Sequence, residues 1–246
     1  MSSEQQIEFS RDNIDLYLKE VAKAYRKLAG KALPAEIVLI GGASILINYG
    51  FRGMTTEVDA LIHASSGMKE AINQVGDKFH LPNGWLNSDF TKTRSYTPKL
   101  YQYAVYYRTY ANVLTVRTIA VEYLIAMKLC SGRQYKNDLS DVLGILAEHK
   151  KSGNPITMEQ IQAAAQDLYG DWDYLPESSR DFIARTMANA HPETLYDQIA
   201  AAEKETKATL IDFERQYPGV ANEANASDII RSLRERKNSA LKDGKA

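Results

Sequence analysis

The chain has 246 residues, of which 44% are hydrophobic, so it can form a sizeable core and is not a disordered chain. Its 30 basic and 31 acidic residues nearly cancel, which gives no support for a broad basic surface for duplex nucleic acid and leaves a local patch open. The single cysteine excludes an intramolecular disulfide and is typical of a reducing compartment.

The expected location is the cytoplasm, with no membrane contact. The first residues lack a basic region followed by an apolar one, so no signal peptide is predicted. No apolar run approaches the ~20 residues that a membrane span needs.

Helices and strands alternate in the first half of the chain. Apolar residues at helical spacing predict a helix from Arg11 to Leu28. The next expected elements are a strand over 36–40, a short helix over 43–49, a strand over 57–62 and a helix over 66–79. A loop over 85–98 then precedes two β-rich runs, 101–108 and 113–118, joined by a hairpin at 110–112.

Almost everything after residue 120 has a helical pattern. The chain therefore predicts an α+β fold: a small mixed β-sheet core with flanking helices, followed by a helical C-terminal half. We expect three parts: an α/β core over 1–119, a helical domain packed on it over 120–220, and a polar helical or frayed tail over 221–246.

A glycine pair, Gly41-Gly42, closes the first apolar strand. Glycines at a strand end let the backbone approach a phosphate, and the following helix start offers unpaired N–H groups to an anion. Strand-to-helix geometry alone also explains such a pair. Ser44, in the first helical turn, either caps the helix or contacts a phosphate.

Two acids follow at strand spacing, because Glu57 and Asp59 alternate with Val58 and Ala60. Residues two apart on a strand project side by side, and two such carboxylates can hold Mg²⁺ against substrate phosphates. The alternative is a solvent-facing edge strand. The glycine turn upstream favours the metal interpretation, and a phosphate cradle with metal carboxylates indicates phosphoryl or nucleotidyl transfer.

These segments resemble the polymerase-β-like nucleotidyltransferase superfamily, whose signature is a Gly-Gly/Ser turn, a helix and an acid-hydrophobic-acid strand. The form Arg52-x-x-Thr55-x-Glu57-x-Asp59 is most similar to the branch of AbiEii-type toxins and their uncharacterised, DUF6036-like relatives. Arg52 either neutralises phosphate or pairs with Glu57.

A second block resembles the Lys…Arg…Lys-x-Asp-x-x-Asp segment of that branch, and its residues are Lys128, Arg133, Lys136, Asp138 and Asp141. Each residue also has a structural explanation. Lys128 can extend its ammonium group to solvent, and Arg133 and Lys136 can be solvated charges in a turn. Asp138 and Asp141 can be acids at a helix N-terminus. The order of the whole block favours function. Together the two blocks cover roughly residues 35–147.

The resemblance implies a Mg²⁺-dependent enzyme that moves a nucleoside monophosphate from a nucleoside triphosphate to a hydroxyl of RNA, such as tRNA, or of a protein. It also implies a toxin or defence role with an antitoxin-like partner. The nucleotide-binding residues would be Gly41, Gly42, Ser44, Arg52, Thr55, Lys128 and Arg133. The catalytic residues would be Glu57, Asp59, Lys128, Asp138 and Asp141, with Glu57 and Asp59 as metal ligands.

Two departures from the superfamily pattern stand out. Glu57 replaces the usual Asp, and the β-rich region 101–118 contains no third carboxylate, for which Asp138 or Asp141 is the natural substitute. The alternative function is therefore a catalytically degenerate protein that binds a nucleotide or a partner without turnover. A third hypothesis is an interaction protein that acts through its C-terminal helices.

Other reactive side chains have structural interpretations. The histidines show no metal spacing, and they are His63, His80, His149 and His191. Cys130 is expected to pack rather than react. The loop over 85–98, with Trp85, Lys92 and Arg94, is either a surface loop or a rim for single-stranded RNA.

Overall fold

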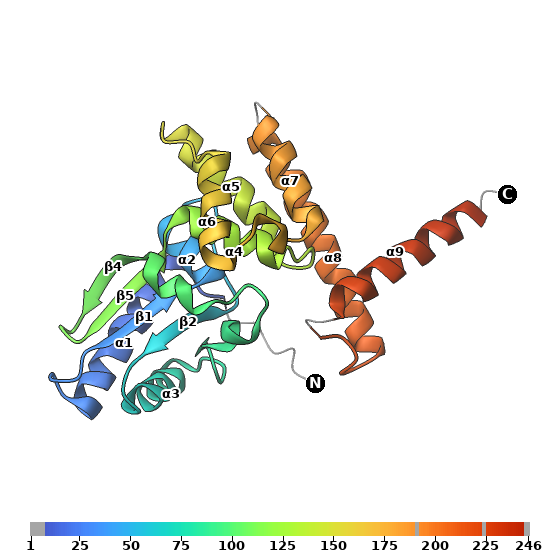
Figure 1. Ribbon diagram of the computed structural model, residues 1–246. Coiled ribbons are helices and arrows are strands. Elements are labelled where there is room, and N and C mark those ends of the chain that lie inside the picture. The colour runs from blue at the N-terminus through green and yellow to red at the C-terminus, as the bar shows by residue number, and fades with distance from the viewer. Residues whose placement is uncertain (1–7, 190–191, 223–224, 244–246) are drawn as a thin grey trace. The chain divides into compact units, whose positions relative to one another are not determined.

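The computed structural model describes residues 8–189, 192–222 and 225–243, in two compact units (Figure 1). The first unit comprises Met1–Cys130 and Ile156–Leu175, and the second comprises Ser131–Pro155 and Pro176–Ala246. The end of the predicted tail, residues 244–246, lies outside the described residues. The expected boundaries at 119 and 220 stay predictions, because compactness does not show which parts fold independently.

The first unit contains a five-stranded mixed sheet of order β3-β2-β1-β5-β4. Its strands are β1 (Ala35–Leu39), β2 (Val58–His63), β3 (Leu86–Asn87), β4 (Ala104–Tyr110) and β5 (Leu114–Ile119). β1 runs parallel to β5 and antiparallel to β2. β3 is parallel to β2, and β4 is antiparallel to β5. The predicted α+β class is confirmed.

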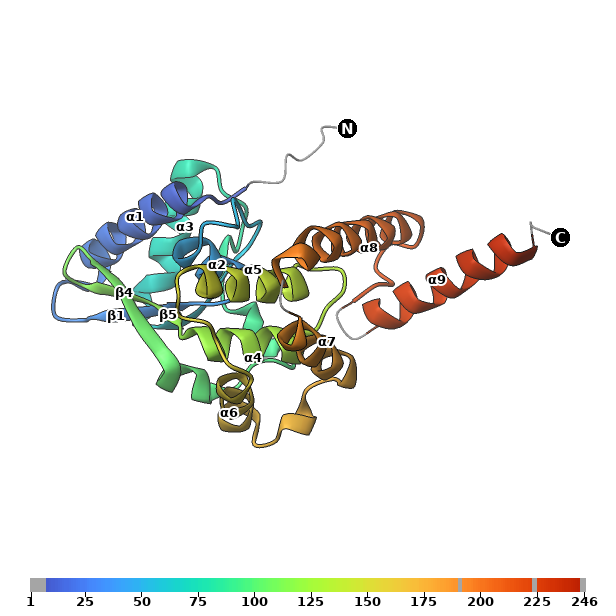
Figure 2. The same ribbon diagram turned by 90° about the horizontal axis from the view of Figure 1, so that it is seen from above.

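Helices cover both faces of this sheet. They are α1 (Arg11–Ala29), α2 (Gly41–Asn48), α3 (Gly67–Phe79), α4 (Val121–Ser131) and α6 (Met158–Tyr169). Figure 2 shows α1 and α3 on one side of the strands and α4 and α6 on the other. Short 3₁₀ turns occupy Asp89–Lys92, Pro98–Tyr103 and Trp172–Tyr174.

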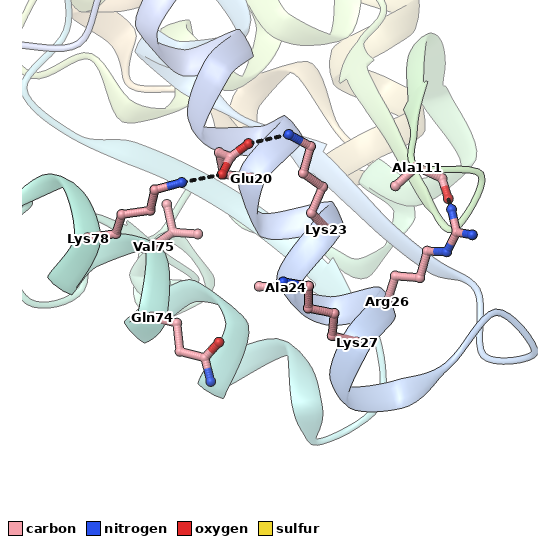
Figure 3. A pocket seen from close by; sticks show the side chains of 9 residues that line it. All are labelled: Glu20, Lys23, Ala24, Arg26, Lys27, Gln74, Val75, Lys78 and Ala111. Carbon is pink, nitrogen blue, oxygen red and sulfur yellow. Dashed lines mark hydrogen bonds and ion pairs between the residues drawn. The ribbon is translucent and has the colours of Figure 1, made fainter.

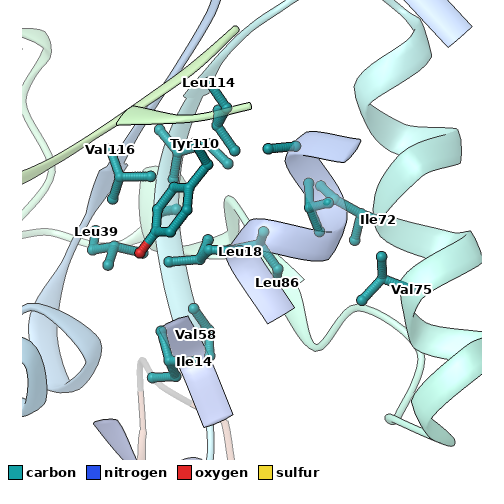
Figure 4. Packing of buried hydrophobic residues seen from close by; sticks show 14 of the residues in the cluster. Ile14, Leu18, Leu39, Val58, Ile72, Val75, Leu86, Tyr110, Leu114 and Val116 are labelled. Atoms are coloured by element: carbon teal, nitrogen blue, oxygen red, sulfur yellow. The ribbon is translucent and has the colours of Figure 1, made fainter. Parts of the chain in front are cut away.

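The core beneath α1 and α3 follows from the two periodicities of helix and strand. Ile14 and Leu18 come from one face of α1, and Leu39 and Val58 from alternate positions of β1 and β2 (Figure 4). Ser10 starts α1 with a capping box, since its hydroxyl accepts from Asn13 N. Because side chains alternate along a strand, the residues next to Leu39 and Val58 on their strands face the other side of the sheet.

Three local expectations needed adjustment. The predicted loop over 85–98 contains the two-residue strand β3, and the short helix begins at Gly41 rather than at residue 43. The second strand begins at Val58, so Glu57 lies just before it. The hairpin turns as predicted, with Ala111 and Asn112 both at positive φ.

The described part of the second unit is mostly helical, as predicted. It contains α5 (Asp138–Lys151), α7 (Glu177–Ala188), α8 (Tyr196–Gln216) and α9 (Ala226–Asp243), with a 3₁₀ turn at Pro192–Leu195. α8 contacts both α5 and α9. Across the described chain, no helix is long and apolar enough to cross a membrane.

Candidate functional site

The glycine turn joins β1 to α2 at one edge of the sheet. Gly41 has a φ of 55°, a left-handed conformation that residues with a Cβ rarely adopt. The N-cap residue of α2 is Ile40, whose apolar side chain makes no capping hydrogen bond. The first N–H groups of this helix therefore retain their capacity to bind an anion.

Gly42 packs closely against the segment that leads into β2. A Cβ at Gly42 would lie 2.7 Å from Thr55 Oγ1 and 2.9 Å from Arg52 Nη2. Thr55 is buried, and its backbone pairs with that of Phe9 at 2.7 and 2.9 Å. Three predicted site residues, Gly42, Arg52 and Thr55, thus lie together, and a Cβ at position 42 would force the side chains of Thr55 and Arg52 to shift.

Asp59 lies beside the same turn. Its carbonyl oxygen accepts from Ile40 N at 2.9 Å, directly before Gly41. The flanking Val58 and Ala60 are fully buried in the core beneath α1 and α3, so the half-buried Asp59 side chain belongs to the other face. Glu57 is exposed and precedes the strand by one residue. The two acids therefore flank the start of β2 at the edge where β1 ends.

Ser44 presents an unusual hydroxyl. Its side chain is fully buried, yet Oγ has no hydrogen-bond partner within the described part of the chain. Leaving a buried hydroxyl unsatisfied costs about 1–3 kcal/mol. A group bound at the start of α2 would offset that cost.

Lys128 lies on α4, which starts two residues after β5. Because β5 is parallel to β1, the carboxyl ends of both strands meet at the edge that carries the glycine turn. Lys128 is only 6% exposed, which excludes a lysine that merely extends into solvent. Burial of an ammonium group is costly without a compensating negative charge.

The remaining predicted residues belong to the second unit. Asp138, at the start of α5, is fully buried and accepts from the backbone N and Nε of Arg133 at 3.2 and 3.0 Å. Asp141, one turn later, is also buried. Their participation in one site with Glu57 and Asp59 stays a prediction, because they lie in different units.

The chain matches a family model described as a nucleotidyltransferase of unknown function (DUF6036) over residues 17–151. It belongs to this nucleotidyltransferase family. The match contains every site residue predicted above, from Gly41 to Asp141. No match was found among curated proteins or among solved structures.

This nucleotidyltransferase-family chain has a buried carboxylate that sequence reasoning missed. Glu203, on α8, accepts from Leu139 N at 2.9 Å and from Ser140 N at 3.3 Å, at the start of α5. Burial raises its pKa to about 7, and the nearby charge of Asp138 also raises it. α8 is rich in charged residues, so no sequence signal distinguishes this glutamate from its solvated neighbours.

We expect the stability of the protein to fall as the pH rises from about 4.5 to about 7. Over this window the unfolded Glu203, with an ordinary pKa of 4.5, loses its proton before the folded one, so the loss reaches about 3 kcal/mol. Glu203→Gln removes this titration and retains an acceptor oxygen. Urea unfolding of the wild-type protein and of Glu203→Gln at pH 5 and pH 8 measures this loss of stability. Equal dependence of stability on pH in the two proteins would contradict the prediction.

The loop over 85–98 is not the aromatic rim considered for RNA. Trp85 and Phe90 are buried, and Trp85 Nε1 donates to Ile72 O at 3.2 Å. Arg94 donates to Tyr174 O at 2.6 Å and lies over the Tyr174 ring, while Lys92 pairs with Asp89. Trp85 and Phe90 are therefore part of the buried interior, and the basic residues Lys92 and Arg94 have partners within the unit.

Sequence reasoning also missed a polar neighbour of Asp59. Asn87 on β3 is paired with Asp59 in the sheet, although its amide is engaged with Gly84 O and Asp89 N. A two-residue strand has too little pattern to be recognised from sequence. Within the described residues, no three acids, histidines or cysteines are grouped to hold a metal ion, and His191 lies outside them.

Cys130 is buried, with Sγ 3.9 Å from Arg94 O. Burial raises the pKa of its thiol, which keeps it protonated at neutral pH. This environment is consistent with the packing role that the sequence predicts.

Proposed function

We propose that this chain is a Mg²⁺-dependent nucleotidyltransferase that transfers a nucleoside monophosphate from a nucleoside triphosphate to a hydroxyl of RNA, such as tRNA, or of a protein. The observation that carries the proposal is the glycine turn beside Asp59. There, a helix start that Ile40 at the N-cap does not cap, a glycine in close contact with Thr55, and the unsatisfied Ser44 hydroxyl occur together. The family membership supports the same reaction class.

The residues present fit a magnesium ion. Mg²⁺ is usually held by one or two carboxylates together with substrate phosphates, and Glu57 and Asp59 would supply these carboxylates. The ion would offset the negative charge of the triphosphate during transfer.

The protein groups have separable tasks in the proposed reaction. The N–H groups at the start of α2 and Ser44 Oγ would bind phosphate oxygens, and Arg52 and Lys128 would supply positive charge. The acceptor hydroxyl loses its proton to solvent and its oxygen forms a bond to the α-phosphorus. The bond from the α-phosphorus to the bridging oxygen of the β-phosphate breaks, and pyrophosphate leaves.

The test is incubation of the protein with Mg²⁺, each α-labelled nucleoside triphosphate, and either total RNA or cell extract. We expect label in an RNA or a protein band with at least one nucleotide. Absence of label with every nucleotide and both acceptor pools would contradict transfer.

Ser44→Ala should affect triphosphate binding and protein stability differently. Removal of an unsatisfied buried hydroxyl should leave the free energy of unfolding unchanged or raise it, by up to about 1 kcal/mol, while affinity for the triphosphate falls. Ser95 is also buried, but its hydroxyl lies 3.1 Å from Thr93 Oγ1, so Ser95→Ala should lower stability and leave affinity unchanged. Calorimetric binding and urea unfolding of both variants provide the measurement; unchanged affinity in Ser44→Ala would argue against the phosphate contact.

A second candidate is a degenerate family member that binds a nucleotide or a partner protein without turnover. The exposed position of Glu57 before β2 favours it, as does the lack of a third grouped carboxylate in the described residues. Nucleotide binding without label transfer would support this candidate.

The biological setting is also part of the proposal. The resemblance to AbiEii-type proteins supports a cytoplasmic toxin or defence component that is controlled by an antitoxin-like partner. Growth arrest on expression, relieved by a neighbouring gene product, would test it.

A further inference from the structure

A hollow of about 520 Å³ lies between α1 and α3 in the first unit (Figure 3). Four cations line it: Lys23, Arg26 and Lys27 from α1, and Lys78 from α3. The only acid in the lining is Glu20, so positive charges exceed negative ones by three. This local excess occurs in a chain whose net charge is −1.

The hollow is remote from the glycine turn. Its lining includes Ala111, from the turn between β4 and β5. That turn adjoins the beginning of β1, where Ala35 N donates to Val113 O at 2.8 Å, whereas Gly41 follows the end of β1. The two places are therefore at opposite ends of the strand.

Local contacts hold the cations in position. The Glu20 carboxylate pairs with Lys23 Nζ at 2.6 Å and with Lys78 Nζ at 2.5 Å. These two ammonium groups lower the pKa of Glu20 to about 2, so it remains ionised at neutral pH. Arg26 Nη1 donates to Ala111 O at 3.1 Å, and Lys27 lies one helical turn beyond Lys23.

We propose that this hollow binds the phosphodiester backbone of a single-stranded nucleic acid. Lysine and arginine side chains bind phosphates through charge. The lining contains no aromatic side chain on which a base could stack, which favours the backbone over the bases. The hollow is limited to the surface between α1, α3 and the turn at Ala111, and the balanced overall charge provides no broad surface for a duplex, so a single strand is the occupant that we propose.

A purely structural explanation covers three of the four cations. Arg26 and Lys27 lie in the last turn of α1, where cations interact favourably with the helix dipole. Lys78 likewise lies in the last turn of α3, so of the four cations only Lys23 lies outside such a turn. Binding and stability measurements on the same variants distinguish the two explanations.

The test is fluorescence anisotropy of a labelled RNA strand, and of a DNA strand of equivalent sequence, titrated with the full chain at several salt concentrations. We expect both strands to bind with salt-dependent affinity. Lys27→Glu should weaken binding about tenfold and Glu20→Gln should strengthen it, while Lys207→Glu, the same charge change on α8, should have little effect. Thermal unfolding checks that each variant is folded.

The proposal is overturned if neither strand binds, or if Lys27→Glu and Glu20→Gln match Lys207→Glu in affinity. It is also overturned if RNA alone binds and Lys27→Glu leaves that binding unchanged. The hollow and the glycine turn lie at opposite ends of β1, so a difference between Lys27→Glu and Lys207→Glu reports on the hollow whether or not the chain catalyses nucleotidyl transfer.

Discussion

Asp59→Ala should abolish nucleotidyl transfer, with a loss of at least about a hundredfold in rate, while the protein remains folded. A metal-ligating carboxylate contributes several kcal/mol to the transition state, and each 1.36 kcal/mol corresponds to a tenfold change in rate. Asp59 is half-buried beside the glycine turn and faces away from the core beneath α1 and α3, so its truncation leaves that core intact. Label transfer and the thermal unfolding midpoint are measured on the same preparation.

Two further variants test whether the effect is specific to the proposed metal ligands. Asp77→Ala removes an exposed acid of α3 and should retain full activity. Glu57→Asp shortens the other proposed ligand to the residue usual in the superfamily, so activity should survive or rise. An unchanged rate in folded Asp59→Ala would reject Asp59 as a ligand, and complete loss in Glu57→Asp would indicate a site adapted to glutamate.

Asp138→Ala should lower the free energy of unfolding by about 3 kcal/mol and should also reduce turnover. The substitution removes a fully buried carboxylate that accepts two hydrogen bonds from Arg133, and loss of one member of a buried ion pair is strongly destabilising. Urea unfolding measures the first effect, and label transfer below the unfolding range measures the second.

The control is an ion pair of the same residue types on the surface. Asp212 and Arg215 on α8 lie 3.2 Å apart with both side chains largely exposed, so Asp212→Ala should cost less than about 1 kcal/mol. Asp138→Asn retains an acceptor oxygen for Arg133. If this variant is stable and fully active, Asp138 stabilises the fold and has no part in catalysis.

The local sequence pattern was sufficient to predict most strands of the sheet. β1 and β2 carry alternating or continuous apolar residues, and a glycine with positive φ follows β1, so both strands and their turn were predictable. β3 was not, because a two-residue strand is specified by its pairing with β2 rather than by its own periodicity. The sequence pattern places Trp85 in a loop for the same reason, although it belongs to the core.

The residues of the candidate site also differ in whether they could be predicted from sequence. Gly42, Arg52, Thr55 and Asp59 are close in sequence, and their proximity follows from one strand-turn-helix segment and the strand paired with it. Glu203 could not be found in this way, because its role depends on the contact between α8 and α5. Sequence-local motifs were thus predictable, and partners supplied by distant helices were not.

The most direct test of the proposed reaction uses one nucleoside triphosphate labelled at the α-phosphate and, in a parallel reaction, at the γ-phosphate, with Mg²⁺ and an RNA or protein acceptor pool. Nucleotidyl transfer predicts that the α-label enters the acceptor while the γ-label is released as pyrophosphate, and that Asp59→Ala prevents both. Entry of the γ-label into the acceptor, or binding of nucleotide with neither label transferred, would contradict it.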